Sequence, residues 1–405
     1  MSLRTLHLFD AGAMSSGPCA MRLLAELHGR LEGVEDEVLV LGGLEEGWRA
    51  RRIGLPGYQR LAPPLRCSGL AIRSVSQFLQ QRGPYSLIHC WSPATFSLAA
   101  LLAATTPRIL TQVTAPDSPA TAHWLRLLLA ERPGEILAAS NTVARRLKTH
   151  GVREDRLHVL RPGLHFGLFD FDTRAEIRAS WGVEEDTKVV ALVGDPARLC
   201  DVWRASWVLT ILRTSGVDAA LVASPRGRRS AAAWERVSSL GWRTRLLLDK
   251  TIEEPWRVLP GCDAVLFLGD DRGEEVSQAS PLWRLPRHRQ RMPGMLPLLW
   301  AMAAGVPVVA EASYAVSEIL EHRHSALLVK PGCTWDAARA LRQIFLDPKL
   351  AWKLSDAARS ESFSFFSRLR FCDQVKKVYE QITEGYPVIV DELPLTGGMR
   401  FGGLP

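Results

Sequence analysis

Residues 292–310 read MPGMLPLLWAMAAGVPVVA, and this stretch decides the fold. Pro297 suits the first turn of a helix and Gly305 suits the position after its last turn, so Leu298–Ala304 is predicted to be helical. The apolar run that follows, VPVVAE at 306–311, reads as a buried strand. A helix followed directly by an apolar strand is half of the repeating unit of a parallel α/β sheet.

The backbone at the start of this helix is the first candidate site. The helix begins just after Gly294, Met295 and Leu296. Free backbone N–H groups at a helix start form a cradle for a diphosphate. Because the cradle needs no particular side chains, these three residues are candidate diphosphate ligands.

Short apolar runs alternate with helical periodicity along the rest of the chain, which is typical of parallel sheets with crossover helices. The first half has the predicted strands LRTLHLF, DEVLVLG, YSLIHCW, RILTQVT and EILAAS; the second has KVVALVG, DAALVAS, TRLLL, CDAVLFLG, VPVVAE and HSALLVKPG. Helices are predicted near Cys19–Leu31 and in TFSLAALLAA, TVARRLKTHGV, WDAARALRQIFLD, LAWKLSDAARSESF and SRLRFCDQVKKVYEQI. The sequence therefore predicts an α/β protein with two doubly wound, Rossmann-like domains. Ligands of such sheets bind beyond the carboxyl ends of the strands.

The opening stretch resembles the donor-sugar segment of family-4 glycosyltransferases (glycosyl transferases group 1), whose usual form is E-G-F-G-L-P-L-L-E-A-M-A-A-G-x-P-V-V-A. From Leu296 to Ala310 the match is almost letter for letter, apart from Trp300, where the family carries a Glu. The family's other Glu, eight positions earlier, is Met292 here. The E-x7-E motif of the family is therefore degenerate in this chain.

A second stretch, RLHVLRPGLHFGLF at 156–169, is similar to the family's V-I-x-P-G-V-D-x-x-x-F segment before the interdomain linker. The resemblance implies the GT-B fold, in which two Rossmann-like domains face a cleft. The implied parts are an N-terminal, acceptor-side domain at 1–169, a C-terminal domain of nucleotide-sugar type at 174–366, a helix at 367–384 that packs back on the first domain, and a flexible tail at 387–405.

The resemblance implies a role for both replaced glutamates. In the family, the Glu at the place of Trp300 holds the ribose hydroxyls of the nucleotide, and the Glu at the place of Met292 contacts the donor sugar. Trp donates one hydrogen bond and accepts none, and Met is a weak acceptor. A charged hydrogen bond is worth about 1.5–3 kcal/mol, so losing two would cost about 2 to 4 decades in donor affinity or rate. From the residues, Trp300 is expected to be a core-facing aromatic rather than a stacking partner for the base.

The phosphate clamp that the resemblance implies is also altered. The family follows its first strand of this domain with an Arg and then a Lys, whereas this chain reads GDPARLCD from Gly194. Arg198 is displaced but within reach of a phosphate, where bidentate pairing is strong; alternatively it is a surface residue. Asp195 and Asp201 would repel an anion.

The segment 270–291 is longer than the corresponding loop of the family and rich in charge. One hypothesis is that Glu274 or Glu275 substitutes for a missing Glu, or that the arginines of the segment bind phosphate. The alternative is a solvated, mobile insertion.

In the first half, the loop that ends near Gly17 occupies the place of the family's G-G-x-x-R loop, with Arg22 matching its Arg. The catalytic His that the family often carries after the strand RILTQVT is absent, and Val113 stands there. His89, in SLIHCWSP, is a weak catalytic candidate at a strand end; the alternative is a histidine whose hydrogen bonds are satisfied in the core.

The net charge of +7 and pI near 9.2 come mainly from arginine. This charge reflects a general preference for Arg over Lys or an attraction to anionic lipid or polyphosphate. Nucleic-acid binding is disfavoured, because no basic run interleaved with aromatics stands out. The seven cysteines have no metal or disulfide spacing. We expect reduced thiols, no metal or cofactor, and a cytoplasmic protein, with peripheral membrane contact as an option.

Two functions stay open at this point. The first is an active, metal-independent, retaining glycosyltransferase that moves a sugar from a nucleoside diphosphate to an unknown acceptor of glycan or lipid-linked type. The second is a pseudo-glycosyltransferase that keeps the fold and binds other molecules in glycan or polysaccharide assembly.

Overall fold

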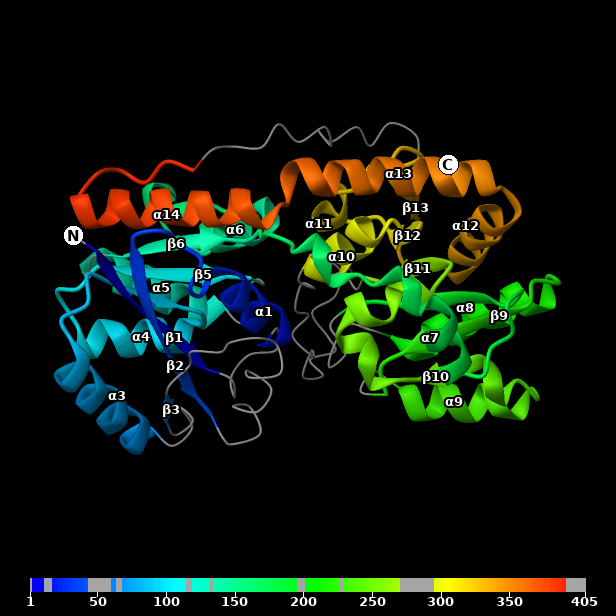
Figure 1. Ribbon diagram of the computed structural model, residues 1–405, viewed down its shortest axis with the longest axis horizontal. Helices are drawn as coiled ribbons and strands as arrows, with labels where there is room; N and C mark the ends of the chain where they lie inside the picture. The colour runs from blue at the N-terminus through cyan, green and yellow to red at the C-terminus, as the bar shows by residue number, and fades with distance from the viewer. Residues whose placement is uncertain are drawn as a thin grey trace, which may run out of the picture. The chain divides into compact units, whose positions relative to one another are not determined.

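The computed structural model describes residues 2–10, 17–42, 60–62, 68–113, 119–131, 134–194, 201–225, 229–269 and 295–390. Within these residues the chain forms two compact units. The first runs to Gly163 and takes in the segment from Arg368; the second runs from Leu164 to Ser367. Each unit is one parallel sheet with flanking helices, so the predicted fold class is confirmed (Figure 1).

The first unit contains a seven-stranded sheet of order β3-β2-β1-β4-β5-β6-β7. Its strands are β1 (Leu3–Asp10), β2 (Val34–Leu41), β3 (Arg60–Ala62), β4 (Leu87–Cys90), β5 (Arg108–Gln112), β6 (Glu135–Ala138) and β7 (Leu157–Val159). The strand order reverses between β1 and β4, which pair in parallel with Leu8 opposite Cys90. YSLIHCW was expected to hold the third strand of the chain and instead holds the fourth, because the three-residue edge strand β3 precedes it.

The helices of this unit are α1 (Gly17–Leu27), α3 (Ser68–Arg82), α4 (Pro93–Leu102), α5 (Pro119–Glu131), α6 (Asn141–Thr149) and α14 (Arg368–Glu384). Two of them begin at serine caps: Ser92 closes a capping box with Thr95 at the start of α4, and Ser140 accepts from the amide of Val143. Each serine lies two residues after the end of a strand, β4 or β6, so the caps fix where the chain turns from strand to helix.

The second unit contains a six-stranded sheet of order β10-β9-β8-β11-β12-β13. Its strands are β8 (Lys188–Leu192), β9 (Ala219–Ala223), β10 (Leu246–Leu248), β11 (Ala264–Phe267), β12 (Val308–Glu311) and β13 (Leu327–Val329), each within a predicted run. Its helices are α7 (Arg174–Ser180), α8 (Val202–Thr214), α9 (Ser230–Ser239), α10 (Leu296–Ala304), α11 (Tyr314–Ser317), α12 (Thr334–Leu346) and α13 (Pro348–Phe365). The order reverses between β8 and β11, and ligands of doubly wound sheets bind at such a reversal.

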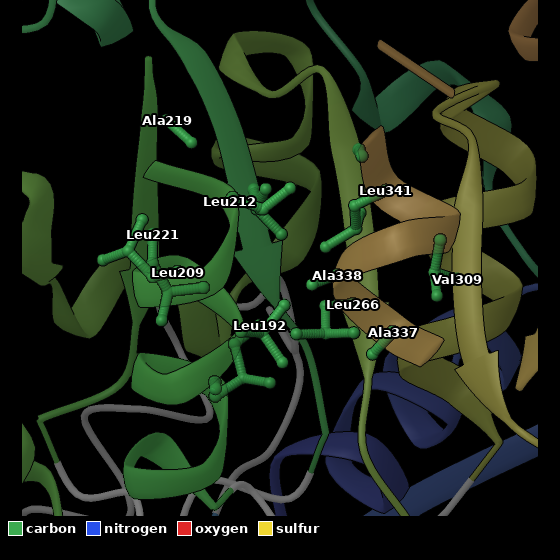
Figure 2. Packing of buried hydrophobic residues seen from close by; sticks show 14 of the residues in the cluster. Leu192, Leu209, Leu212, Ala219, Leu221, Leu266, Val309, Ala337, Ala338 and Leu341 are labelled. Carbon is green, nitrogen blue, oxygen red and sulfur yellow. The ribbon is translucent and has the colours of Figure 1, made fainter. Parts of the chain in front are cut away.

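The core of the second unit lies between its sheet and helices α8 and α12. Leu209 and Leu212 of α8 and Leu341 of α12 meet Leu192 of β8 and Leu266 of β11 (Figure 2). All five side chains are at most 2% exposed. Burying a leucine contributes about 1.5–3 kcal/mol, so this layer holds the strand ends of β8 and β11 in fixed positions.

The division between the units falls at Gly163, whereas the sequence placed the two domains at 1–169 and 174–366. Leu164 belongs to the second unit because its amide donates to the carbonyl of Phe366 at 2.7 Å. Phe166 stacks on Phe363 with 3.9 Å between ring centroids. These contacts with the end of α13 fix the segment that follows Gly163. Helix α14 belongs to the first unit and contacts α1.

Candidate functional site

Helix α10 is the centre of the candidate site in the second unit. It spans Leu296–Ala304, with Pro297 in its first turn and Gly305 in the left-handed conformation (φ +65°) at its end, as the sequence predicted. Met295 occupies the capping position, and its side chain makes no hydrogen bond to the first turn. Along the chain, α10 comes between β11 and β12, which are parallel neighbours in the sheet. A helix that connects two parallel strands starts near the carboxyl end of the first strand, so the first turn of α10 lies at the carboxyl edge of the sheet. Its backbone N–H groups therefore point to the edge where a diphosphate would bind.

Trp300 faces the core, and this expectation is confirmed. Its side chain is 3% exposed and meets Trp256 edge-to-face, with ring centroids 4.9 Å apart at 70°. Such aromatic pairs add about 0.5–1.5 kcal/mol to what area burial contributes. In this arrangement the indole at position 300 packs against protein and offers no acceptor to a ribose.

Gly194 lies two residues after the end of β8 and has a φ of +152°, a conformation that favours glycine. It therefore lies just beyond the carboxyl end of a strand at the order reversal, where the candidate phosphate loop begins. Arg198, Met292 and Gly294 lie outside the described residues, as do Asp195 and the segment 270–291.

Sequence reasoning missed a buried ion pair at the same edge. Glu311, the last residue of β12, is 2% exposed and accepts hydrogen bonds from the guanidinium of Arg204, one of them at 3.3 Å. It also accepts from the amide of Gly332 at 2.7 Å. The pair thus joins the end of β12 to the first turn of α8 and to the turn before α12. The sequence did offer one indication of this pair, because the apolar run VPVVAE ends with an acidic residue.

Asp201 was expected to repel an anion, and the structure shows that it has a structural role. It caps α8 by accepting from the amide of Arg204 at 3.3 Å. Its other oxygen accepts from the guanidinium of Arg229 at 2.7 Å. The ion pair offsets the negative charge of Asp201, so the repulsion expected from the sequence is reduced.

His89, the weak catalytic candidate of the first unit, lies inside the core of that unit. It is fully buried, with Nε2 2.7 Å from the hydroxyl of Thr111 and Nδ1 2.5 Å from that of Tyr379 on α14. Its ring stacks on Trp91 with 4.6 Å between centroids. Burial lowers the pKa of His89 well below its usual value and raises that of Tyr379. The alternative reading, a satisfied core histidine, matches this geometry.

This burial makes the stability of the first unit depend on pH. The folded protein keeps His89 neutral, so the full stability is present above the ordinary histidine pKa of 6.5. As the pH falls below that value, the stability decreases, because His89 of the unfolded chain binds a proton that the buried side chain does not bind. Asp36 acts at lower pH. Burial opposes its ionisation, but the hydrogen bond with His28 and the nearby imidazole of His7 hold its pKa far below the usual 3.8. We expect urea midpoints to fall between pH 7 and pH 4.5, and to fall less steeply in His89→Gln. An unchanged slope in that variant would contradict the assignment, and His150→Gln at the end of α6 serves as the control.

The remaining candidates of the first unit lie on α1 and after β5. Gly17 begins α1, and Arg22 on this helix pairs with Glu26 at 2.7 Å. Glu26 also contacts Arg368 of α14 at 3.4 Å, which ties α1 to that helix. Val113 follows β5 and is 5% exposed, so an apolar side chain stands where the family often has a histidine.

No group of three or more His, Cys, Asp or Glu side chains is arranged to hold a metal ion in the described ranges. None of the helices described there is both long and apolar enough to cross a membrane.

Comparison with known proteins agrees with this geometry. Residues 21–166 match the family model described as Glycosyltransferase Family 4, and residues 265–361 match that of Glycosyl transferases group 1. A D-inositol 3-phosphate glycosyltransferase from Actinosynnema mirum is 30% identical over 212 residues, which are 51% of this chain and 48% of that protein. One of the same name from Mycobacteroides abscessus is 22% identical over 72% of this chain and 66% of its own length. The match thus spans about half of the first relative and less than two thirds of the second.

Among solved structures, Anabaena HepE in complex with UDP and glucose aligns with a TM-score of 0.71 at 17% identity, over 94% of this chain and 100% of that one. At this identity the alignment supports the fold. The two family models match the two units separately, and the second covers the α10 segment. The chain therefore belongs to the family-4-like glycosyltransferases of the GT-B fold.

Proposed function

We propose that the protein transfers a sugar from a nucleoside diphosphate sugar to an acceptor, with retention of configuration and without a metal ion. The observation that carries this proposal is the first turn of α10. It lies at the carboxyl edge of the second sheet and contains Pro297, and the side chain of Met295, at the capping position, makes no hydrogen bond to its amides. Its segment is also the part of the chain that matches the family almost letter for letter.

The chemistry of such a site rests on charge and position. The departing diphosphate gains negative charge, which the backbone amides of Met295 and Leu296 and the guanidinium of Arg198 would stabilise. The glycine conformation at Gly194 would let the backbone approach the phosphates closely. Since the backbone amides belong to a buried helix, they need little reorganisation during transfer.

The relatives suggest which donors and acceptors to try first. HepE was solved with UDP and glucose, and the matched enzymes are named for D-inositol 3-phosphate. We propose a UDP-sugar as the first donor and a hydroxylated, glycan-like acceptor as the acceptor class.

A second function, a pseudo-glycosyltransferase that serves as a binding protein in glycan assembly, is favoured by one observation. Trp300 is buried against Trp256, where the family places a carboxylate that holds the ribose. Without that carboxylate, donor binding would rest on the phosphate contacts alone.

Donor titration separates the two functions. With UDP-, GDP- and ADP-sugars in a calorimeter, we expect micromolar binding of one donor together with slow donor hydrolysis. Arg198→Ala is expected to weaken donor binding by about 10- to 100-fold. This loss corresponds to the about 1.5–3 kcal/mol that a hydrogen bond to a charged group contributes. Arg243→Ala is the matched control, because it removes an equal charge before β10, at the amino edge of the sheet.

The outcomes are distinct. A folded protein that binds none of the three donors would contradict the transferase and favour the binding protein. Equal losses in both arginine variants would contradict the role of Arg198 while leaving the donor assignment in place.

A further inference from the structure

Helices α12 and α13 carry an unusual set of exposed side chains. Trp335 on α12 and Trp352 on α13 are each 68% exposed, and Leu346 at the end of α12 is 63% exposed. Exposed cations accompany them. The α12–α13 surface is defined here as Trp335, Arg339, Arg342, Leu346, Lys349 and Trp352.

Along α12 these residues form one stripe. Trp335, Arg339, Arg342 and Leu346 follow one another at spacings of four, three and four, which places them on a single helix face. Another face of the same helix is buried in the core of the second unit through Ala337, Ala338 and Leu341, among others. The stripe is therefore held rigidly by a packed helix.

Exposed apolar and cationic side chains also flank the turn into α13. Only Asp347 separates the two helices, and it caps α13 by accepting from the amide of Leu350 at 3.0 Å. Lys349 and Trp352 lie in the first turns of α13, three residues apart and hence on one face. The turn that joins α12 and α13 is short (Figure 1). Leu346, Lys349 and Trp352 follow one another at spacings of three residues along the sequence around it.

The local charge is positive. Residues 335–353 contain four cations and two carboxylates. One carboxylate, Asp347, serves as the helix cap, and the other, Asp336, lies 3.5 Å from Arg339. Arg342, Lys349 and the adjacent Lys353 remain exposed beside the apolar side chains.

We propose that the α12–α13 surface docks the protein on an anionic lipid bilayer. Tryptophan rings and cationic side chains occupy the same depth at the headgroup level of a membrane, so their alternation along one face suits that environment. A protein partner fits less well, because lysine is depleted at protein–protein interfaces and the apolar residues here are interleaved with cations. This docking is independent of the sugar transfer proposed above.

Vesicle sedimentation tests the docking with the full chain. We expect the protein to sediment with vesicles of phosphatidylcholine mixed equally with phosphatidylserine, and not with phosphatidylcholine alone. The pair Trp335→Ala and Trp352→Ala is expected to weaken this binding at least tenfold. The pair Arg342→Gln and Lys349→Gln is expected to weaken it by about 25-fold, since each cation near an anionic surface contributes about fivefold.

The matched control is Trp124→Ala with Arg153→Gln, which changes an exposed tryptophan and an exposed arginine of the first unit. It is expected to bind as the unaltered protein does. The proposal would be overturned by no sedimentation with the anionic vesicles, by equal binding to both vesicle types, or by equal losses in the control. Binding to polyglutamate with no binding to vesicles would overturn it in favour of an acidic protein partner.

Discussion

Trp300→Ala is expected to lower the free energy of unfolding by about 3–5 kcal/mol, the usual cost of deleting a buried large aromatic side chain. The indole is 3% exposed on a helix whose residues are all buried, so its removal leaves a cavity beside Trp256. Urea denaturation followed by circular dichroism measures the loss. Trp352→Ala is the matched control: its side chain is 68% exposed, and the expected change is within about 0.5 kcal/mol.

Trp300→Glu distinguishes a core residue from a lost ligand. A carboxylate at a position packed against Trp256 would be buried without a charged partner, which is more costly than the cavity left by alanine. We therefore expect this variant to be less stable than Trp300→Ala and to gain no donor affinity, although it restores the residue type of the family. A stable variant with tighter donor binding would show that side chain 300 points to the donor and not to the core.

The strands were predictable because apolar runs in a parallel sheet are continuous and local. All six strands of the second unit fall within runs such as KVVALVG and CDAVLFLG, and α10 is framed by Pro297 and Gly305. Elements with weak local signals were missed. β3 has three residues, and α8 carries Trp203, Arg204 and Trp207 among its apolar positions.

The candidate site was predictable only where it depends on the backbone. The α10 cradle follows from a helix start, which the sequence marks. The state of His89 depends on Tyr379, which lies 290 residues further along the chain, and no local pattern reports such a contact. The pairing of Arg204 with Glu311, 107 residues apart, was missed for the same reason.

That pair supports the second prediction of large effect. Glu311→Ala is expected to lower the free energy of unfolding by about 3–5 kcal/mol, because it leaves the guanidinium of Arg204 partly buried without its carboxylate and removes the acceptor of the Gly332 amide. Asp336→Ala is the control, since the exposed pair of Asp336 with Arg339 contributes at most about 1 kcal/mol.

A double-mutant cycle assigns the cost of Glu311→Ala to the pair itself. If Arg204→Met is combined with Glu311→Leu, both charges are replaced by apolar groups, and we expect most of the lost stability to return, because no unpaired charge stays buried. Additive losses in the double variant would contradict this account. Donor titration of the same double variant then asks what the pair does at the carboxyl edge. Unchanged affinity would mean that it only ties β12 to α8, whereas weaker binding in a protein of recovered stability would mean that the charge of Arg204 itself reaches the phosphates.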